Sequence, residues 1–186
     1  SSNMRHDIGA KTLLAGFTLP ANQTCAQDVN LALDNIAGHM NVAPFIARQL
    51  IQRFVTSNPS PGYIQRVATV FEDNGLPDHE RGDLGAVIQA ILLDAEARTP
   101  GAASYGKLRE PVQRFVHWAR AFGATSTGDA WDVGDLSDPG SRLGQSPLRS
   151  PSVFNFFRPG YIPPNTALAA QGLVGPEFQL TNESTV

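Results

Sequence analysis

The sequence lacks several features that would assign it to a class of function. It has one cysteine, Cys25, in 186 residues, so no disulfide forms within the chain. Lys and Arg number 14 against 17 Asp and Glu, and the net charge of -3 offers no basic excess to neutralise nucleic-acid phosphates. No apolar run reaches about 18 residues. We therefore expect no nucleic-acid partner and no membrane span.

Signatures of catalysis are equally scarce. The sequence contains no G-x-S-x-G elbow, no GxGxxG motif, no P-loop and no Cys–His pair that could act as nucleophile and base. Imidazole and carboxylate, which suit divalent metals, occur together at His6-Asp7 and Asp78-His79-Glu80. Their spacing matches no ligand pattern and both lie in polar turns, so solvated loop residues are the preferred interpretation. We predict no metal site and no cofactor.

Amphipathic helices are what the sequence does contain. Apolar residues recur at helical spacing in five segments, each with start and stop signals. Thr24 with Gln27 forms a capping box, and Asp83 lies where its carboxylate favours a helix N-terminus. Cys25 falls on the first apolar stripe and is predicted to be a buried core side chain. The five predicted helices cover residues 24–38, 41–58, 60–75, 83–98 and 110–123.

The clearest of these signals is the run NVAPFIARQLIQRFVTSNPSPGYIQRVATVF, residues 41–71. Pro44 lies in a first helical turn, where its missing N–H costs nothing. Asn58-Pro59 stops the helix, because a residue before proline is pushed out of the α region. Ser60 then caps the next helix. Five such stripes joined by short corners predict an all-α fold, a helical bundle.

Beyond the helices the composition changes. Gly, Ser, Asp and Pro dominate residues 124–164, where the only apolar cluster is residues 153–157 with three phenylalanines. Exposing such a cluster would be costly, which favours an arm that wraps the bundle and inserts these aromatics as an anchor. Residues 167–172 are compatible with one further turn. We predict a helical bundle with an irregular lead-in over residues 1–123 and an extended Pro/Gly-rich arm over 124–186, both within one domain.

The sequence blocks themselves resemble a known family. They are APFIARQLIQRFVTSNPSPGYIQRVATVF, GDLGAVIQAILLDAEAR, GKLREPVQRFVHWARAFGA, SPSVFNFFRPGYIPP and GLVGPEFQL, preceded by HDIGAKTLLAG. In this order they are similar to the C-terminal half of the bacterial domain of unknown function family 1800, DUF1800. The resemblance covers nearly the whole chain.

This resemblance implies a context and no reaction. Family members are longer, which implies a fragment whose helical remainder, before and after it, is an expected partner. Members are mostly predicted to be exported, which implies a periplasmic or extracellular location. They are often encoded beside a second uncharacterised family similar to sulfatases and phosphatases. No activity of the family is established, so the resemblance implies no catalytic residues.

Arginine-rich helix faces are the remaining candidates for a site. Arg109, Arg114 and His117 lie at or before the polar face of the last predicted helix, and Arg48 lies on the polar face of the second. Guanidinium groups bind carboxylate, sulfate or phosphate bidentately, so these four residues are predicted to form an anion or ligand site. The alternative is that these polar faces are simply solvated. Trp118 is predicted to pack, whereas Trp131 and Tyr161 could stack on sugar rings.

Two functions follow from these observations. The first is a non-catalytic role, in which an exported bacterial helical protein binds a partner protein or an extracellular polymer such as a polysaccharide. The absence of a nucleophile or metal motif favours it. The second is a hydrolase of an extracellular polymer, with a site shared with the missing half of the chain. Whether the chain is an enzyme stays open at this point.

Overall fold

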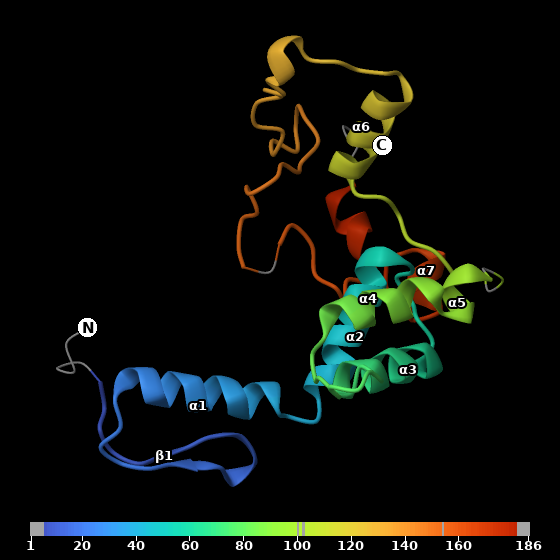
Figure 1. Ribbon diagram of the computed structural model, residues 1–186. Helices are drawn as coiled ribbons and strands as arrows, with labels where there is room; N and C mark the ends of the chain where they lie inside the picture. Colours follow the sequence, from blue (N-terminus) through green and yellow to red (C-terminus); the bar gives the residue numbers. More distant parts are fainter. Residues whose placement is uncertain (1–5, 100, 102, 154, 182–186) are drawn as a thin grey trace.

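The computed structural model describes residues 6–99, 101, 103–153 and 155–181, and most of its regular structure is helical (Figure 1). The helices are α1 Cys25–Ala37, α2 Val42–Phe54, α3 Pro61–Glu72, α4 Leu84–Leu93, α5 Ala95–Arg98, α6 Pro111–Ala121 and α7 Ala167–Ala170, with 3-10 turns η2 Leu14–Gly16, η3 Thr127–Asp129 and η4 Pro176–Leu180. Strands β1 Lys11–Thr12 and β2 Thr18–Leu19 pair antiparallel, with Lys11 opposite Leu19. The predicted all-α class is confirmed, with this short hairpin added.

The hydrophobic core lies between α2, α3 and α4. Small side chains on α2, Ala43 and Ala47, let the neighbouring helices approach closely, and Ile51 continues the same buried face. Tyr63 of α3 is fully buried, and its hydroxyl donates to the carbonyl oxygen of Ile91 at 2.6 Å. Burial raises the pKa of Tyr63, so the phenol stays protonated and keeps donating. The other core residues are Val67, Ala68, Phe71, Val87 and Ile91.

Helix starts follow their predicted caps. The Thr24 hydroxyl accepts from the amide of Gln27, and the Gln27 side chain accepts from the amide of Thr24, which completes the capping box. Ser60 caps α3 by accepting from the amide of Tyr63 at 3.1 Å. Asp83 caps α4 in the same way, accepting from the amide of Ala86 at 3.1 Å. These local signals were sufficient because each involves groups three residues apart.

Two helix ends differ from the prediction. Helix α2 ends at Phe54, not near residue 58, because Thr56 leaves the helix to exchange hydrogen bonds with Gly106 at 3.1 and 2.9 Å. The fourth predicted helix is divided at Asp94. The Asp94 carboxylate accepts from the amide of Glu96 at 2.8 Å, and it receives two hydrogen bonds from Arg66. Asp94 thereby ends α4 and caps the short helix α5.

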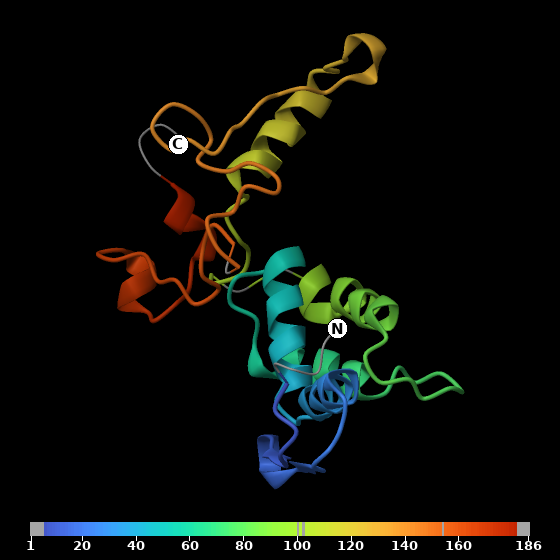
Figure 2. The same ribbon diagram turned by 90° about the vertical axis from the view of Figure 1, so that its left-hand side faces the viewer.

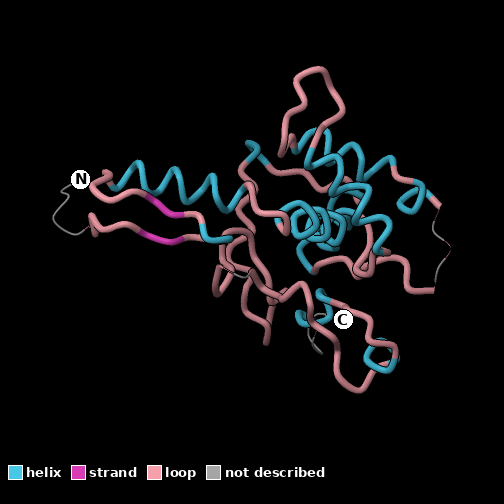
Figure 3. The backbone as a smooth tube through the Cα atoms, turned by 90° about the horizontal axis from the view of Figure 1, so that it is seen from below, coloured by secondary structure: helices cyan, strands magenta, loops and turns pink. Residues whose placement is uncertain are grey.

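Helices α1 and α6 project from the α2–α4 core (Figures 1 and 2). The apolar stripe of α1 is about half exposed, and Cys25 is exposed, so the prediction of a buried cysteine is wrong. The reason is that α1 lies beside the hairpin, as Figure 3 shows, and its apolar stripe does not pack on the core. Asn35 of α1 exchanges two hydrogen bonds with the backbone of Leu14, at 3.1 and 3.3 Å.

The end of the chain returns to the core. Phe157 is buried, and the Arg53 guanidinium lies over its ring, 4.5 Å from the centroid. The Asn58 side chain exchanges two 2.9 Å hydrogen bonds with the backbone of Val174. Within the predicted aromatic anchor, Val153 is exposed and Phe154 lies outside the described residues, so Phe157 supplies the buried ring. These contacts place Phe157 and Val174 beside the C-terminal end of α2.

Truncating the core tests the importance of the α2 face. Ile51→Ala removes a fully buried side chain and should lower the free energy of unfolding by about 3 kcal/mol, through lost burial and a cavity. Leu92→Ala is the matched control, because Leu92 of α4 is largely exposed, and it should change the value by about 0.5 kcal/mol at most. Urea unfolding followed by circular dichroism measures both. Equal losses would contradict the assigned core.

Docking of α1 on the hairpin should depend on pH through Asp28. The carboxylate of Asp28 lies 2.9 Å from Lys11 and from His6, and the hydrogen bond from Lys11 is the main cause that lowers the pKa of Asp28. A lowered pKa in the folded state means that the stabilisation is present above about pH 4 and is lost as pH falls further. The urea concentration at the unfolding midpoint should therefore decrease as the pH is lowered below about 4.

Asp28→Asn should lower stability at pH 7 and flatten this pH dependence. Asp34→Asn, a change at an exposed aspartate of the same helix, should leave the urea midpoint at pH 7 and its pH profile as they are. An unchanged pH profile in Asp28→Asn would show that another group carries the dependence.

Candidate anion-binding groove

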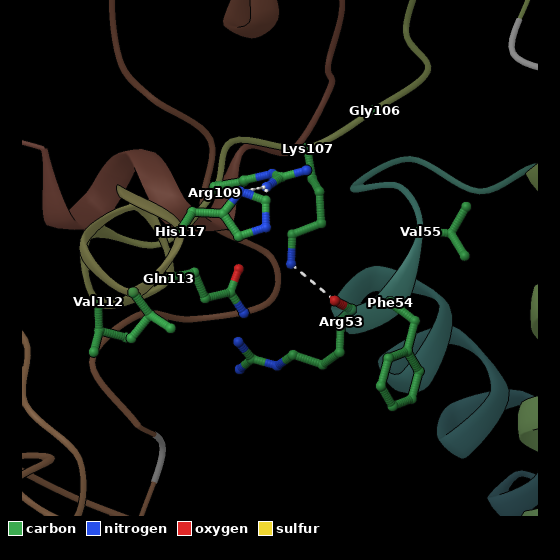
Figure 4. A pocket seen from close by; sticks show the side chains of 10 residues that line it. Arg53, Phe54, Val55, Gly106, Lys107, Arg109, Val112, Gln113 and His117 are labelled. Atoms are coloured by element: carbon green, nitrogen blue, oxygen red, sulfur yellow. Dashed lines mark hydrogen bonds between the residues drawn. The ribbon is translucent and has the colours of Figure 1, made fainter. Parts of the chain in front are cut away.

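A groove of about 680 Å³ lies between the C-terminal end of α2 and helix α6. One side of the groove is formed by Gly106, Lys107 and Arg109, which precede α6. Another side is formed by the end of α2 and Val55 (Figure 4). Polar and apolar side chains both contribute to the lining. The lining residues are Arg53, Phe54, Val55, Gly106, Lys107, Arg109, Val112, Gln113, Val116 and His117.

Arg109 and His117 form the exposed cationic part of the groove. Nη1 of Arg109 lies 2.5 Å from Nδ1 and 3.0 Å from Nε2 of His117. A guanidinium can only donate, so a ring nitrogen of His117 is the acceptor in this contact. No carboxylate of the described residues lies within ion-pair distance of Arg109. Its positive charge is therefore available to a ligand.

Lys107 carries a charge that is already neutralised. Its ammonium group lies 2.9 Å from a carboxylate oxygen of Glu177 and donates to the carbonyl oxygen of Arg53 at 3.0 Å. The side chains of Lys107 and Glu177 are 11% and 2% exposed, so this is a buried ion pair. A buried pair of this kind holds α2, the segment before α6 and η4 together, and it adds no net charge to the groove.

Arg53 is also opposed by an acid. Its Nη1 lies 3.3 Å from Glu110, and the second carboxylate oxygen of Glu110 accepts from the side-chain amide of Gln145. Glu110 is buried directly before α6. Three cations in the lining thus face two buried carboxylates, Glu110 and Glu177, which leaves one positive charge. That remaining charge lies at Arg109.

Comparison with known proteins places the chain. Residues 1–185 match the family described as Protein of unknown function (DUF1800). The chain is a member of the DUF1800 family. No curated protein and no solved structure matches it. The resemblance found in the sequence blocks is confirmed, and the family description assigns no activity.

Of the four predicted site residues of this DUF1800 chain, only two lie in the groove. Arg109 and His117 lie together in the groove, as Figure 4 shows, whereas Arg48 is exposed on α2 outside the lining. Arg114 is half-buried on α6 and also lies outside it. Arg53 takes the place expected for Arg48. Five residues along an α-helix rotate a side chain by about 140°, so Arg48 and Arg53 point to different surroundings.

The histidine–carboxylate clusters each have a local partner. His6 lies 2.9 Å from Asp28, and His79 lies 2.9 Å from Asp73. The Asp73 pKa is lowered, first by the amide of Gly75 and then by His79. In the described part of this DUF1800 chain, no three His, Cys, Asp or Glu side chains are grouped as metal ligands. Nor does this part hold a helix of the length and apolarity that crossing a membrane demands.

A second hollow, of about 440 Å³, lies on the other side of α6 and is almost wholly apolar. Trp118 is 59% exposed there, so the prediction that it packs is wrong. Its contacts are with rings of its own helix end, at 6.5 Å between centroids for Phe115 and 5.5 Å for Phe122. Trp131 lines the same hollow, whereas Tyr161 is half-buried elsewhere.

Breaking the buried ion pair should destabilise the DUF1800 chain. Glu177→Gln leaves the Lys107 ammonium buried without a carboxylate, and we expect a loss of about 3 kcal/mol in the free energy of unfolding. The double change Lys107→Met with Glu177→Leu removes both charges and should recover most of that loss. Urea unfolding measures each variant. Glu80→Gln, at an exposed glutamate, is the control, and equal effects at both sites would contradict the pair's role.

Proposed function

We propose that this chain is a non-catalytic binding module, which takes an anionic group of a partner protein or an extracellular polymer into the groove between α2 and α6. The observation that carries the proposal is the Arg109 guanidinium, exposed in the groove and unopposed by a carboxylate of the described residues. Export, as the family resemblance implies, would bring the groove to such partners.

The donors of the groove suit an anion. A guanidinium presents parallel N–H groups that match the two oxygens of a carboxylate or the oxygens of a sulfate. Gln113, whose amide points into the groove in Figure 4, supplies a further donor beside Arg109. The walls are partly apolar, and low polarity strengthens a charged hydrogen bond relative to water.

The lining favours binding over catalysis. Its ten residues, all within the described ranges, include no Ser, Thr, Cys, Asp or Glu side chain, so the lining offers no hydroxyl, thiol or carboxylate nucleophile and no pair of acids. His117 is its one candidate general base, and a nitrogen of that ring is engaged by Arg109. The hydrolase alternative therefore rests on residues outside this lining.

Arg109→Gln tests the site. It should weaken sulfate and acetate binding about tenfold or more, since hydrogen bonds to a charged group contribute about 1.5–3 kcal/mol. Arg48→Gln is the matched control, an exposed arginine outside the groove, and should leave affinity unchanged. Equal losses in both variants would mean non-specific attraction. Turnover of a polymer ester or glycoside by the chain would instead support the hydrolase.

A further inference from the structure

We infer that the groove recognises the C-terminal carboxylate of a partner polypeptide whose last residue is apolar; this inference rests on the proposed anion-binding function. Three features of the lining carry it: its single net positive charge, its exposed apolar side chains and the side-chain amide of Gln113. Each matches one part of such a terminus.

The net charge favours a monoanion over a dianion such as sulfate or a phosphate monoester, so a dianion should bind more weakly. The ammonium of Lys107 is bound to Glu177, and Arg53 is opposed by Glu110, so Arg109 alone contributes an unopposed positive charge. A carboxylate brings one negative charge, whereas a phosphate monoester brings about two at neutral pH. The second charge of a phosphate would meet no counterion and would lie near two buried carboxylates. The balance therefore favours a carboxylate.

The apolar side chains of the lining favour a ligand in which an apolar side chain lies next to the carboxylate. Phe54 at the end of α2 is 50% exposed and Val116 of α6 is 45% exposed, and both line the groove. Val55 beside Phe54 and Val112 on α6 also line the groove, so apolar side chains lie on both of its sides (Figure 4). A sugar acid, with hydroxyl groups around its carboxylate, would leave these surfaces uncovered, whereas an apolar side chain would remove them from water. The volume of about 680 Å³ is that of a ligand-sized site.

Gln113 selects a peptide over a simple fatty acid. Its side-chain amide lies between the guanidinium of Arg53 and the Arg109–His117 pair in Figure 4, and it makes no hydrogen bond with the described residues. An amide offers one acceptor and two donors, which complement the N–H and C=O of a peptide group next to a terminal carboxylate. Capture of a terminal carboxylate is a known mode of peptide recognition.

The test is an NMR titration of the full chain with a panel of small probes. N-acetyl-phenylalanine carries all three features, N-acetyl-glycine lacks the apolar group, N-acetyl-phenylalanine amide lacks the charge, and octanoate lacks the peptide group. Sulfate reports anion binding alone. We expect N-acetyl-phenylalanine to bind about tenfold or more tightly than each of the other probes.

Variants assign the contacts. Phe54→Ser should lower the affinity for N-acetyl-phenylalanine about tenfold and leave the affinity for sulfate unchanged. The control Leu92→Ser, at an exposed residue of α4, should change neither affinity. Gln113→Leu should lower the affinity for N-acetyl-phenylalanine and leave the affinity for octanoate unchanged.

The outcomes separate the two proposals. Equal affinity for N-acetyl-phenylalanine, N-acetyl-glycine and sulfate would overturn the peptide inference and leave the anion-binding function standing. Tighter binding of octanoate would identify an aliphatic acid as the ligand and overturn the polypeptide source. Absence of binding by every anion, sulfate included, would overturn the proposed function and the inference with it.

Discussion

The burial of one face of α2 beneath α3 and α4 is the contact on which the rest of the structure depends. Ala43 and Ala47 leave room for the neighbouring helices, and Ile51 fills the space between them. The hydroxyl of Tyr63 then satisfies a carbonyl oxygen near the end of α4. Because these helices are fixed, the C-terminal end of α2 is fixed as well, and Lys107 and Glu110 are held against that end.

Polar groups at this end of α2 tie together segments that are far apart along the chain. The backbone oxygen of Arg53 receives the Lys107 ammonium, which is also held by Glu177. The Arg53 guanidinium covers Phe157 and faces Glu110. The consequence is an electrostatic one: the cations nearest the core are used for structure, and the exposed guanidinium of Arg109 remains for binding. The groove is lined by three cationic side chains, but two of them are paired with carboxylates, so its net charge is small.

Local signals in the sequence were enough for the helix starts, because the caps at Thr24 and Ser60 act within three residues. Helix ends and burial depend on distant partners. The sequence could not show that Thr56 binds Gly106 instead of extending α2, or that the stripe of α1 stays exposed. For the site, the sequence pointed to arginine-rich helix faces, and of the four residues named there the structure brings only Arg109 and His117 together in the groove. The Lys107–Glu177 pair was not predictable, because no periodic pattern relates the two positions.

The most direct test of the account is a crystal structure of the chain with N-acetyl-4-bromophenylalanine, whose bromine locates the ligand by its anomalous signal. The account predicts a carboxylate within hydrogen-bond distance of the Arg109 guanidinium and a bromine against Phe54. It also predicts that the Lys107–Glu177 contact is retained. A ligand bound in the apolar hollow beside Trp118, with the groove left empty, would contradict the central claim that the α2–α6 groove recognises an anion.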